Sequence, residues 1–186
     1  MKKLKYFLMG SFIAPTLAIS GGLERSELPT SFLYEDGNYL EVTYINRNFE
    51  ITDNMFAPSR SMLDDVSSVH FATKFDAGEN LSVGLARYNQ AGASHNYQGA
   101  GSPIPGFSAV GPKTDLSINA LTLMGRYAFD DFSAIGGIKI STVADATADI
   151  FKLAGATTAA SVTGGSDTGL VAGVAYERPE IALRVE

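Results

Sequence analysis

The strongest structural signal in the sequence is a pair of alternating runs on either side of an acidic turn. Residues 116–141 read Leu-Ser-Ile-Asn-Ala-Leu-Thr-Leu-Met-Gly-Arg-Tyr-Ala-Phe-Asp-Asp-Phe-Ser-Ala-Ile-Gly-Gly-Ile-Lys-Ile-Ser. Apolar and more polar side chains alternate on both sides of Asp130-Asp131, with the period of two that indicates a β-strand exposed to different surroundings on its two faces. Aromatic residues flank this acidic turn: Tyr127, Phe129 and Phe132. Two long strands, a short turn and aromatic side chains at that turn are typical of an outer-membrane β-barrel hairpin.

The rest of the chain repeats this unit. Further strands are predicted, from their alternation, at 39–47, 67–75, 81–88, 169–177 and 181–185. The connections fall into two alternating classes, which are short at 76–80, 130–131 and 178–180 and long at 48–66, 89–114 and 142–168. Outer-membrane barrels have short periplasmic turns and longer outer loops. The prediction is an all-β, antiparallel transmembrane β-barrel, and the alternative is a soluble β-sandwich with aromatic core residues.

The N-terminus predicts export. Lys2, Lys3 and Lys5 precede an apolar run at 6–19, and Ala18-Ile19-Ser20 offers small residues for cleavage. This is the pattern of a secretory signal peptide, and the run is shorter than the ~20 residues that a membrane-spanning helix needs. We therefore expect a signal peptide at 1–20, a short plug-like lead-in segment at 21–38 and a partial barrel at 39–186, located in the outer membrane of a Gram-negative cell.

The number of predicted strands indicates an incomplete barrel. About seven strands are predicted, whereas single-chain bacterial barrels have an even number. An open sheet edge would also leave unpaired backbone groups in lipid. We therefore expect the chain to be the N-terminal portion of a larger barrel whose C-terminal strands are missing. The alternative is that several copies close one barrel together.

The composition excludes several classes of function. The chain has 186 residues, no Cys and a formal net charge of -6. Without Cys there is no disulfide, thiol nucleophile or Cys-type zinc site, and an acidic balance argues against binding to nucleic acid. His70 and His95 lack the neighbours that a metal site needs, and the Gly-rich residues 164–169 lack the Lys of a phosphate loop. We expect no enzyme activity, no metal and no cofactor.

Four segments resemble one family. Residues 21–26, 32–41, 120–127 and 175–184 resemble the FadL/TodX-type outer-membrane transport proteins, and the similarity covers nearly all of the chain after residue 20. The resemblance implies a barrel plugged by an N-terminal hatch that takes up hydrophobic molecules, such as long-chain fatty acids or hydrocarbons, by passive diffusion. It also implies an apolar groove among the outer loops, a second site inside the barrel and a lateral exit at a kinked third strand.

Candidate ligand-binding residues follow from the strand faces and the long loops. Ile104, Phe107 and Val110 are apolar residues in a polar loop, which indicates either a capture patch for a lipid-like ligand or a loop packed on itself. Arg126 and Lys139 fall on faces assigned to the lumen, together with Lys74, His70 and Glu41. A lumenal cation pairs either with a carboxylate ligand or with another lumenal charge.

Gly84 lies in the third predicted strand. A glycine within a strand marks a bulge or kink, here the lateral-exit candidate, or makes room for a bulky neighbour. The function expected from the sequence is passive transport of hydrophobic small molecules across the outer membrane, with outer-membrane lipid as the surrounding partner. The alternative is a small structural or adhesin-like barrel whose long loops bind partners.

Overall fold

The computed structural model describes residues 25–50, 61, 63–98, 111–153, 156–178 and 183–185. The predicted signal peptide at 1–20 and the candidate residues Ile104, Phe107 and Val110 lie outside the described residues. The described elements are a single 3₁₀ turn and nine strands: η1 (Ser31–Tyr34), β1 (Tyr39–Arg47), β2 (Val66–Asp76), β3 (Leu81–Asn96), β4 (Lys113–Phe129), β5 (Phe132–Val143), β6 (Ala146–Leu153), β7 (Ala156–Val162), β8 (Gly165–Arg178) and β9 (Leu183–Val185).

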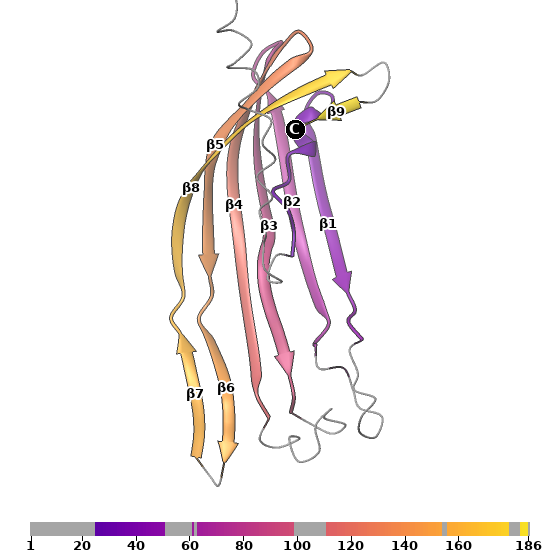
Figure 1. Cartoon of the computed structure of the whole chain (residues 1–186). Coiled ribbons are helices and arrows are strands. Elements are labelled where there is room, and N and C mark those ends of the chain that lie inside the picture. Colours follow the sequence, from indigo (N-terminus) through magenta and orange to yellow (C-terminus); the bar gives the residue numbers. More distant parts are fainter. Residues whose placement is uncertain are drawn as a thin grey trace, which may run out of the picture.

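The nine strands form one antiparallel sheet that curls into an open half-barrel (Figure 1). The main path runs β1-β2-β3-β4-β5-β8-β9, so neighbours in the sheet are neighbours in the chain except where β6 and β7 intervene. The prediction of an all-β antiparallel sheet is confirmed, and the seven predicted strands are the seven strands of this path. Period-two alternation located them because each strand has one face inside the curl and one outside.

The two ends of the sheet differ, as the sequence predicts. At the upper end in Figure 1, β2 and β3 are joined by residues 77–80 and β4 and β5 by Asp130-Asp131. Asp130 has a φ of 52°, a left-handed conformation that the short side chain of Asp tolerates better than most. At this end Phe132 stacks on Phe129 with ring centroids 6.1 Å apart and meets Tyr176 at 5.1 Å. The aromatic cluster predicted at the short turns is therefore present.

The prediction of a long loop at 142–168 is wrong for most of its residues, and the prediction of a long loop at 89–114 is wrong at 89–96 and 113–114, whereas residues 99–110 lie outside the described part of the chain. β3 continues to Asn96 and β4 begins at Lys113, so these strands stay paired well beyond the predicted boundaries. Within residues 142–168, β6 and β7 pair with each other as a hairpin, which prolongs β5 and β8 beyond a break at which Gly164 N donates to Asp145 Oδ1. The Ala-, Thr- and Ser-rich composition resembled a loop, but ladder pairing satisfies the backbone groups that a loop would leave to water.

The two faces of the half-barrel carry different side chains. Small and polar residues face the concave side, among them Ala72, Lys74, Ala86, Thr122 and Ser133, which are all buried. Large apolar residues face the convex side and are exposed on six strands: Leu40, Val42, Tyr44, Val69, Phe71, Phe75, Leu81, Val83, Leu85, Leu121, Leu123, Tyr127, Phe129, Phe132, Ile138, Leu170 and Val174. The usual arrangement of a soluble sheet, with its large apolar side chains in the core, is therefore inverted.

Candidate functional site on the concave face

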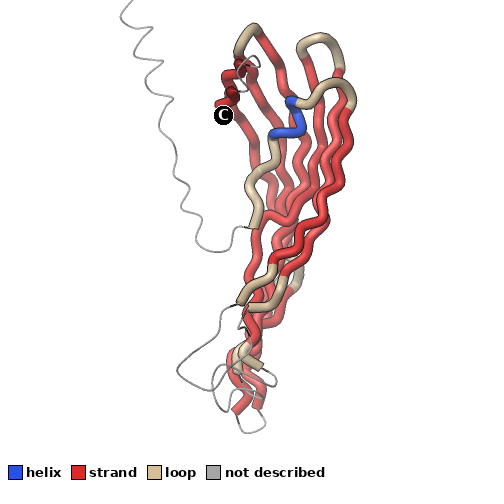
Figure 2. The backbone as a smooth tube through the Cα atoms, turned by 90° about the vertical axis from the view of Figure 1, so that its right-hand side faces the viewer, coloured by secondary structure: helices blue, strands red, loops and turns tan. Residues whose placement is uncertain are grey.

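The segment at 25–38 lies on the concave face of the sheet, where η1 packs against β2 and β3 (Figure 2). Phe32 and Leu33 are almost completely buried, at 1% and 0% exposure. They pack in a cluster with Ala72, Ala86, Met124 and Ile135, which come from four strands. This is the core of the molecule, and the segment expected from the sequence to act as a plug supplies its two largest apolar side chains.

Gly84 lies directly beneath these two side chains. A Cβ atom added to Gly84 would come within 2.4 Å of Phe32 Cε2 and 2.6 Å of Leu33 Cδ2, closer than side-chain atoms approach one another. Pairing of Gly84 with Lys74 and with Met124 is regular, and the register of β3 shifts instead between Asn89 and Ala91. The structure therefore places Gly84 where a bulky neighbour needs room and places the irregularity of the third strand at Gln90.

The bulge at Gln90 fastens the start of the segment. A bulged residue is left out of the ladder, so its carbonyl group is free to accept other donors. The carbonyl oxygen of Gln90 accepts from Arg25 N at 2.9 Å and from Ser26 N at 3.2 Å, and its side chain accepts from Ser141 Oγ at 2.9 Å. The segment is thus held at this point by backbone hydrogen bonds and farther along by Phe32 and Leu33.

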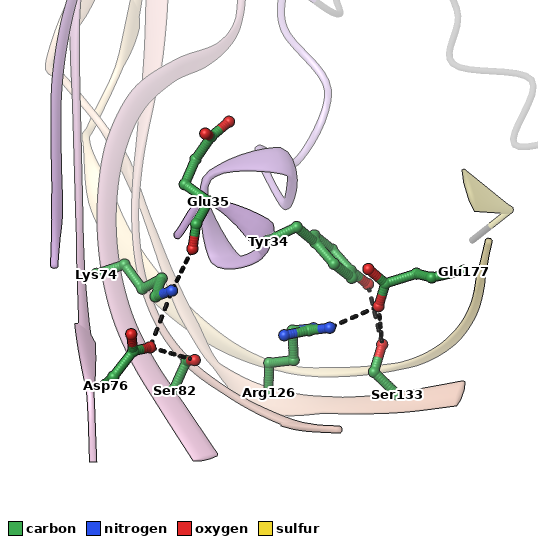
Figure 3. A network of polar contacts seen from close by, with 8 residues as sticks. All are labelled: Tyr34, Glu35, Lys74, Asp76, Ser82, Arg126, Ser133 and Glu177. Atoms are coloured by element: carbon green, nitrogen blue, oxygen red, sulfur yellow. Dashed lines mark hydrogen bonds and ion pairs between the residues drawn. The ribbon is translucent and has the colours of Figure 1, made fainter. Parts of the chain in front are cut away.

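A polar network holds the other end of the segment (Figure 3). Arg126 Nη2 lies 2.6 Å from Glu177 Oε1, and both side chains are largely buried. Ser133 Oγ donates to Glu177 Oε1 at 3.2 Å and lies 3.4 Å from Tyr34 Oη. The guanidinium carbon of Arg126 also lies 4.4 Å from the centre of the Tyr34 ring, within the range of a cation–π interaction.

A second ion pair lies beside the first, on β2. Lys74 is buried at 3% exposure, and its Nζ lies 2.9 Å from Asp76 Oδ1. Lys74 also donates to the carbonyl oxygen of Glu35, while Ser82 Oγ donates to Asp76 Oδ1 at 2.8 Å (Figure 3). The buried ammonium group therefore links the sheet to the backbone just after η1. Both pairs border an open, polar cavity of about 860 Å³ at the end of the sheet with the short turns.

The predicted ligand residues Arg126 and Lys139 do not form one site. Arg126 pairs with Ile135 on β5, and Lys139 lies four residues farther along that strand, which corresponds to roughly 13 Å at ~3.3 Å per residue. Arg126 already has Glu177 and Tyr34 as partners. The sequence left two interpretations of Arg126, a contact with a ligand carboxylate and a pair with another charged side chain. The ion pair with Glu177 matches the second.

A second cavity, which the sequence analysis did not identify, lies at the opposite end of the concave face. It has a volume of about 310 Å³ and is lined by Arg25, Arg47, Phe49, Leu63, Asp64, Val66, Gly92, Ala93, Ser94 and His95. Arg47 Nη2 donates to the carbonyl oxygen of Arg25 at 2.7 Å. Alternation along β1 puts Arg47 on the same face as Glu41 and Thr43, so the face of Arg47 could be predicted from the sequence. Its contact with Arg25 could not, because the two residues lie in different segments of the chain.

The chain was compared with protein-family models, curated proteins and solved structures. No family model, curated protein or solved structure matches the chain. Among the described residues, no helix is long and apolar enough to cross a membrane. Within the same residues, no group of three or more His, Asp or Glu side chains has the arrangement of a metal site.

Proposed function

We propose that the chain forms part of an outer-membrane β-barrel through which hydrophobic small molecules, such as long-chain fatty acids or hydrocarbons, pass by diffusion. The observation that carries this proposal is the convex face, where 17 large apolar side chains on six strands are exposed. A soluble monomer rarely exposes so continuous an apolar surface, whereas lipid accommodates it.

The extent of this apolar surface supports the proposal. On β4 it runs from Leu121 to Phe129, and these nine residues rise roughly 23 Å along a barrel axis at ~3.3 Å per residue and a ~40° tilt. The apolar band of an outer-membrane barrel is about 25 Å tall. At the border of this surface away from the short turns, the polar residue Thr142 is exposed on β5. Arg87 faces outward beside Leu121 near this border, where a long side chain keeps its charge in water.

The segment on the concave face supports the transport function. In the FadL/TodX-type proteins that the sequence resembles, an N-terminal hatch plugs the barrel, and here the segment at 25–38 occupies the concave face through Phe32, Leu33 and the polar network. Movement of this segment would open a path along the small and polar side chains beneath it. The corresponding experiment reconstitutes the chain in lipid vesicles and measures the entry of a fluorescent fatty acid. Entry no faster than into empty vesicles contradicts the transport proposal.

Replacing Leu123 by lysine separates a membrane barrel from a soluble sheet. Leu123 is 47% exposed on the convex face, near the middle of the apolar surface. A lysine at the bilayer midplane costs about 2–4 kcal/mol, whereas an exposed substitution in water changes stability by about 0.5 kcal/mol or less. We expect Leu123→Lys to lower the free energy of unfolding in lipid vesicles by the larger amount. Asn46→Lys, on the same face beyond the band, is the matched control and is expected to have little effect.

One observation favours a second function, that of a surface barrel whose outer parts bind partners. The β6–β7 hairpin extends the sheet well past the apolar surface, and only Lys113 and Thr114 of β4 pair with it (Figure 1). A hairpin exposed in this way is a suitable binding element for an adhesin-like protein. Deletion of residues 146–162 with unchanged fatty-acid entry but lost cell attachment would favour this second function.

A further inference from the structure

His70 closes a gap between two strands of the sheet. The ladder between β2 and β3 ends at the pair Phe71 and Arg87, beyond which β2 stays paired with β1 and β3 stays paired with β4. Asn89 lies just past the end of this ladder and is only 5% exposed, so its backbone N–H has little access to water. Buried backbone donors need a partner, and Asn89 N donates to His70 Nε2 at 3.3 Å. The imidazole thus takes the place of a backbone acceptor.

This hydrogen bond fixes the protonation state of the ring. A ring nitrogen accepts a hydrogen bond only when it carries no proton, so the proton of the neutral His70 ring lies on Nδ1. A second proton would enter at Nε2 and would place one N–H group against the N–H group of Asn89. Ser68 Oγ, which lies 3.2 Å from the same Nε2, can change from donor to acceptor by rotation of its hydroxyl group. The backbone N–H of Asn89 cannot, so its hydrogen bond is lost on protonation.

The bulge of β3 next to this hydrogen bond holds the start of the N-terminal segment. Arg25 N and Ser26 N both donate to the carbonyl oxygen of Gln90. Arg25 Nη1 donates to Asn89 Oδ1 at 3.3 Å. Three hydrogen bonds of the segment therefore end on the part of β3 whose backbone His70 holds in place.

The charge of a protonated ring would act on the same segment. Arg47 Nη2 donates to the Arg25 carbonyl oxygen at 2.7 Å and to Ser26 Oγ at 3.4 Å. Arg47 and Glu41 are also charged side chains of β1 whose field acts on His70. An imidazolium ring would repel the Arg47 guanidinium group and would be attracted to Glu41, with which it shares a cavity of about 120 Å³. Both movements separate groups that fasten the segment.

The other groups around the imidazole keep their charge while histidine titrates. They belong to β1, β3 and the segment: Glu41, Thr43 and Arg47; Arg87 and Tyr88, whose ring meets the imidazole edge-on at 6.3 Å between centroids; and Pro29, Ser31 and Phe32. Histidine is the side chain whose ordinary pKa, ~6.5, puts its change of charge between about pH 5 and 8. A change of pH in this range therefore acts on the cluster through His70.

We infer that His70 makes the attachment of the N-terminal segment dependent on pH. With a neutral ring, Asn89 and the bulge are fixed and the segment is fastened to the concave face. With a protonated ring, the contacts of Arg25 and Ser26 weaken. The attachment is therefore complete above the pKa of His70 and is lost as the pH falls through it. The inference goes beyond the proposed function, because it concerns the hold on the segment and not what passes through the barrel.

The test measures amide hydrogen exchange by NMR on the full chain in detergent micelles, at about pH 8 and about pH 5. After correction for the intrinsic pH dependence of exchange, we expect the protection of the Arg25, Ser26 and Asn89 amides to fall at least about tenfold at the lower pH. His70→Gln keeps a neutral acceptor and is expected to retain the high protection at both pH values. His70→Lys carries a charge and no acceptor, and is expected to show the low protection at both.

His95→Gln is the matched control, because His95 is the other of the two histidines in the chain and is exposed near the far end of β3. This variant is expected to keep the wild-type response to pH. Equal protection of the wild-type amides at both pH values, or a wild-type response in His70→Gln, overturns the inference. Circular dichroism establishes that each variant is folded, and the comparison of the wild type with His70→Gln decides if His70→Lys does not fold.

Fatty-acid entry into vesicles tests the proposed function separately. Entry combined with exchange that does not depend on pH overturns the pH-dependent attachment alone. Exchange that depends on pH through His70, without entry, supports the attachment and contradicts transport.

Discussion

Gly84→Val is expected to displace the N-terminal segment from the concave face. The new side chain would occupy the space of Phe32 Cε2, which lies 2.4 Å from the position of a Cβ atom, so Phe32 and Leu33 must move away. Overpacking costs about 1–3 kcal/mol, and each large apolar side chain that leaves the core costs about 1.5–3 kcal/mol more. We expect trypsin to cleave after Arg25 or Arg47 at least about a hundredfold faster, because cleavage follows the population of the open form.

Gly136→Val is the matched control for this variant. Gly136 lies in β5, on the convex face, and a Cβ atom there would meet nothing within 4 Å. The same substitution therefore adds the same volume and β-branching without touching the segment, and trypsin sensitivity is expected to stay at the wild-type level. A Gly84→Val protein as resistant to trypsin as Gly136→Val would show that Phe32 and Leu33 do not pack on Gly84.

Glu177→Ala is expected to be the most destabilising single change in the polar network. Removal of this carboxylate leaves Arg126 in a largely buried position without its ion-pair partner, and its Nε already lacks a hydrogen bond to the described residues. Breaking a buried ion pair costs about 3–5 kcal/mol, and the value here should lie near the lower limit since the pair is 16% and 21% exposed. The measurement is the free energy of unfolding in denaturant.

The double variant Arg126→Met/Glu177→Leu tests the cause of this loss. Replacing both charges by apolar side chains of similar size removes the orphaned cation, so we expect the double variant to regain most of the stability that Glu177→Ala loses. If it is as unstable as Glu177→Ala, the loss does not come from an uncompensated charge. Lys113→Ala serves as the control for removal of an exposed charge and is expected to change stability by about 0.5 kcal/mol or less.

The strands could be predicted from the sequence because the alternation of apolar and polar side chains involves only neighbouring residues. In β4, Leu121, Leu123 and Tyr127 are exposed on one face, and Thr122 and Met124 are buried on the other. The boundaries were less accurate. Runs such as Ala-Thr-Ala-Asp at 146–149 have weak alternation, and their β-structure comes from pairing with residues 159–162 across the hairpin.

The contacts that build the candidate site were not predictable, because they join residues far apart in the chain. Gly84 has a bulky neighbour from residue 32, Arg126 pairs with residue 177, and the Gln90 carbonyl accepts from residues 25 and 26. The alternation along a strand predicts which face of the sheet each residue occupies, but not which residues from elsewhere in the chain pack on that face. For the same reason, the sequence placed Arg126 on the concave face but did not distinguish a ligand site from an internal ion pair.

The odd number of strands on the main path has a consequence for closure of the sheet. Seven strands that alternate in direction leave β1 and β9 at the two edges, and both run from the short-turn end toward the long-connection end. Two copies rotated about a common barrel axis would therefore meet edge to edge with parallel strands at both seams. A closure with antiparallel pairs at both seams takes an odd number of further strands, the first beside β9 and the last beside β1. The polarity of the two edges of the described sheet therefore limits which further strands could close it with antiparallel pairs.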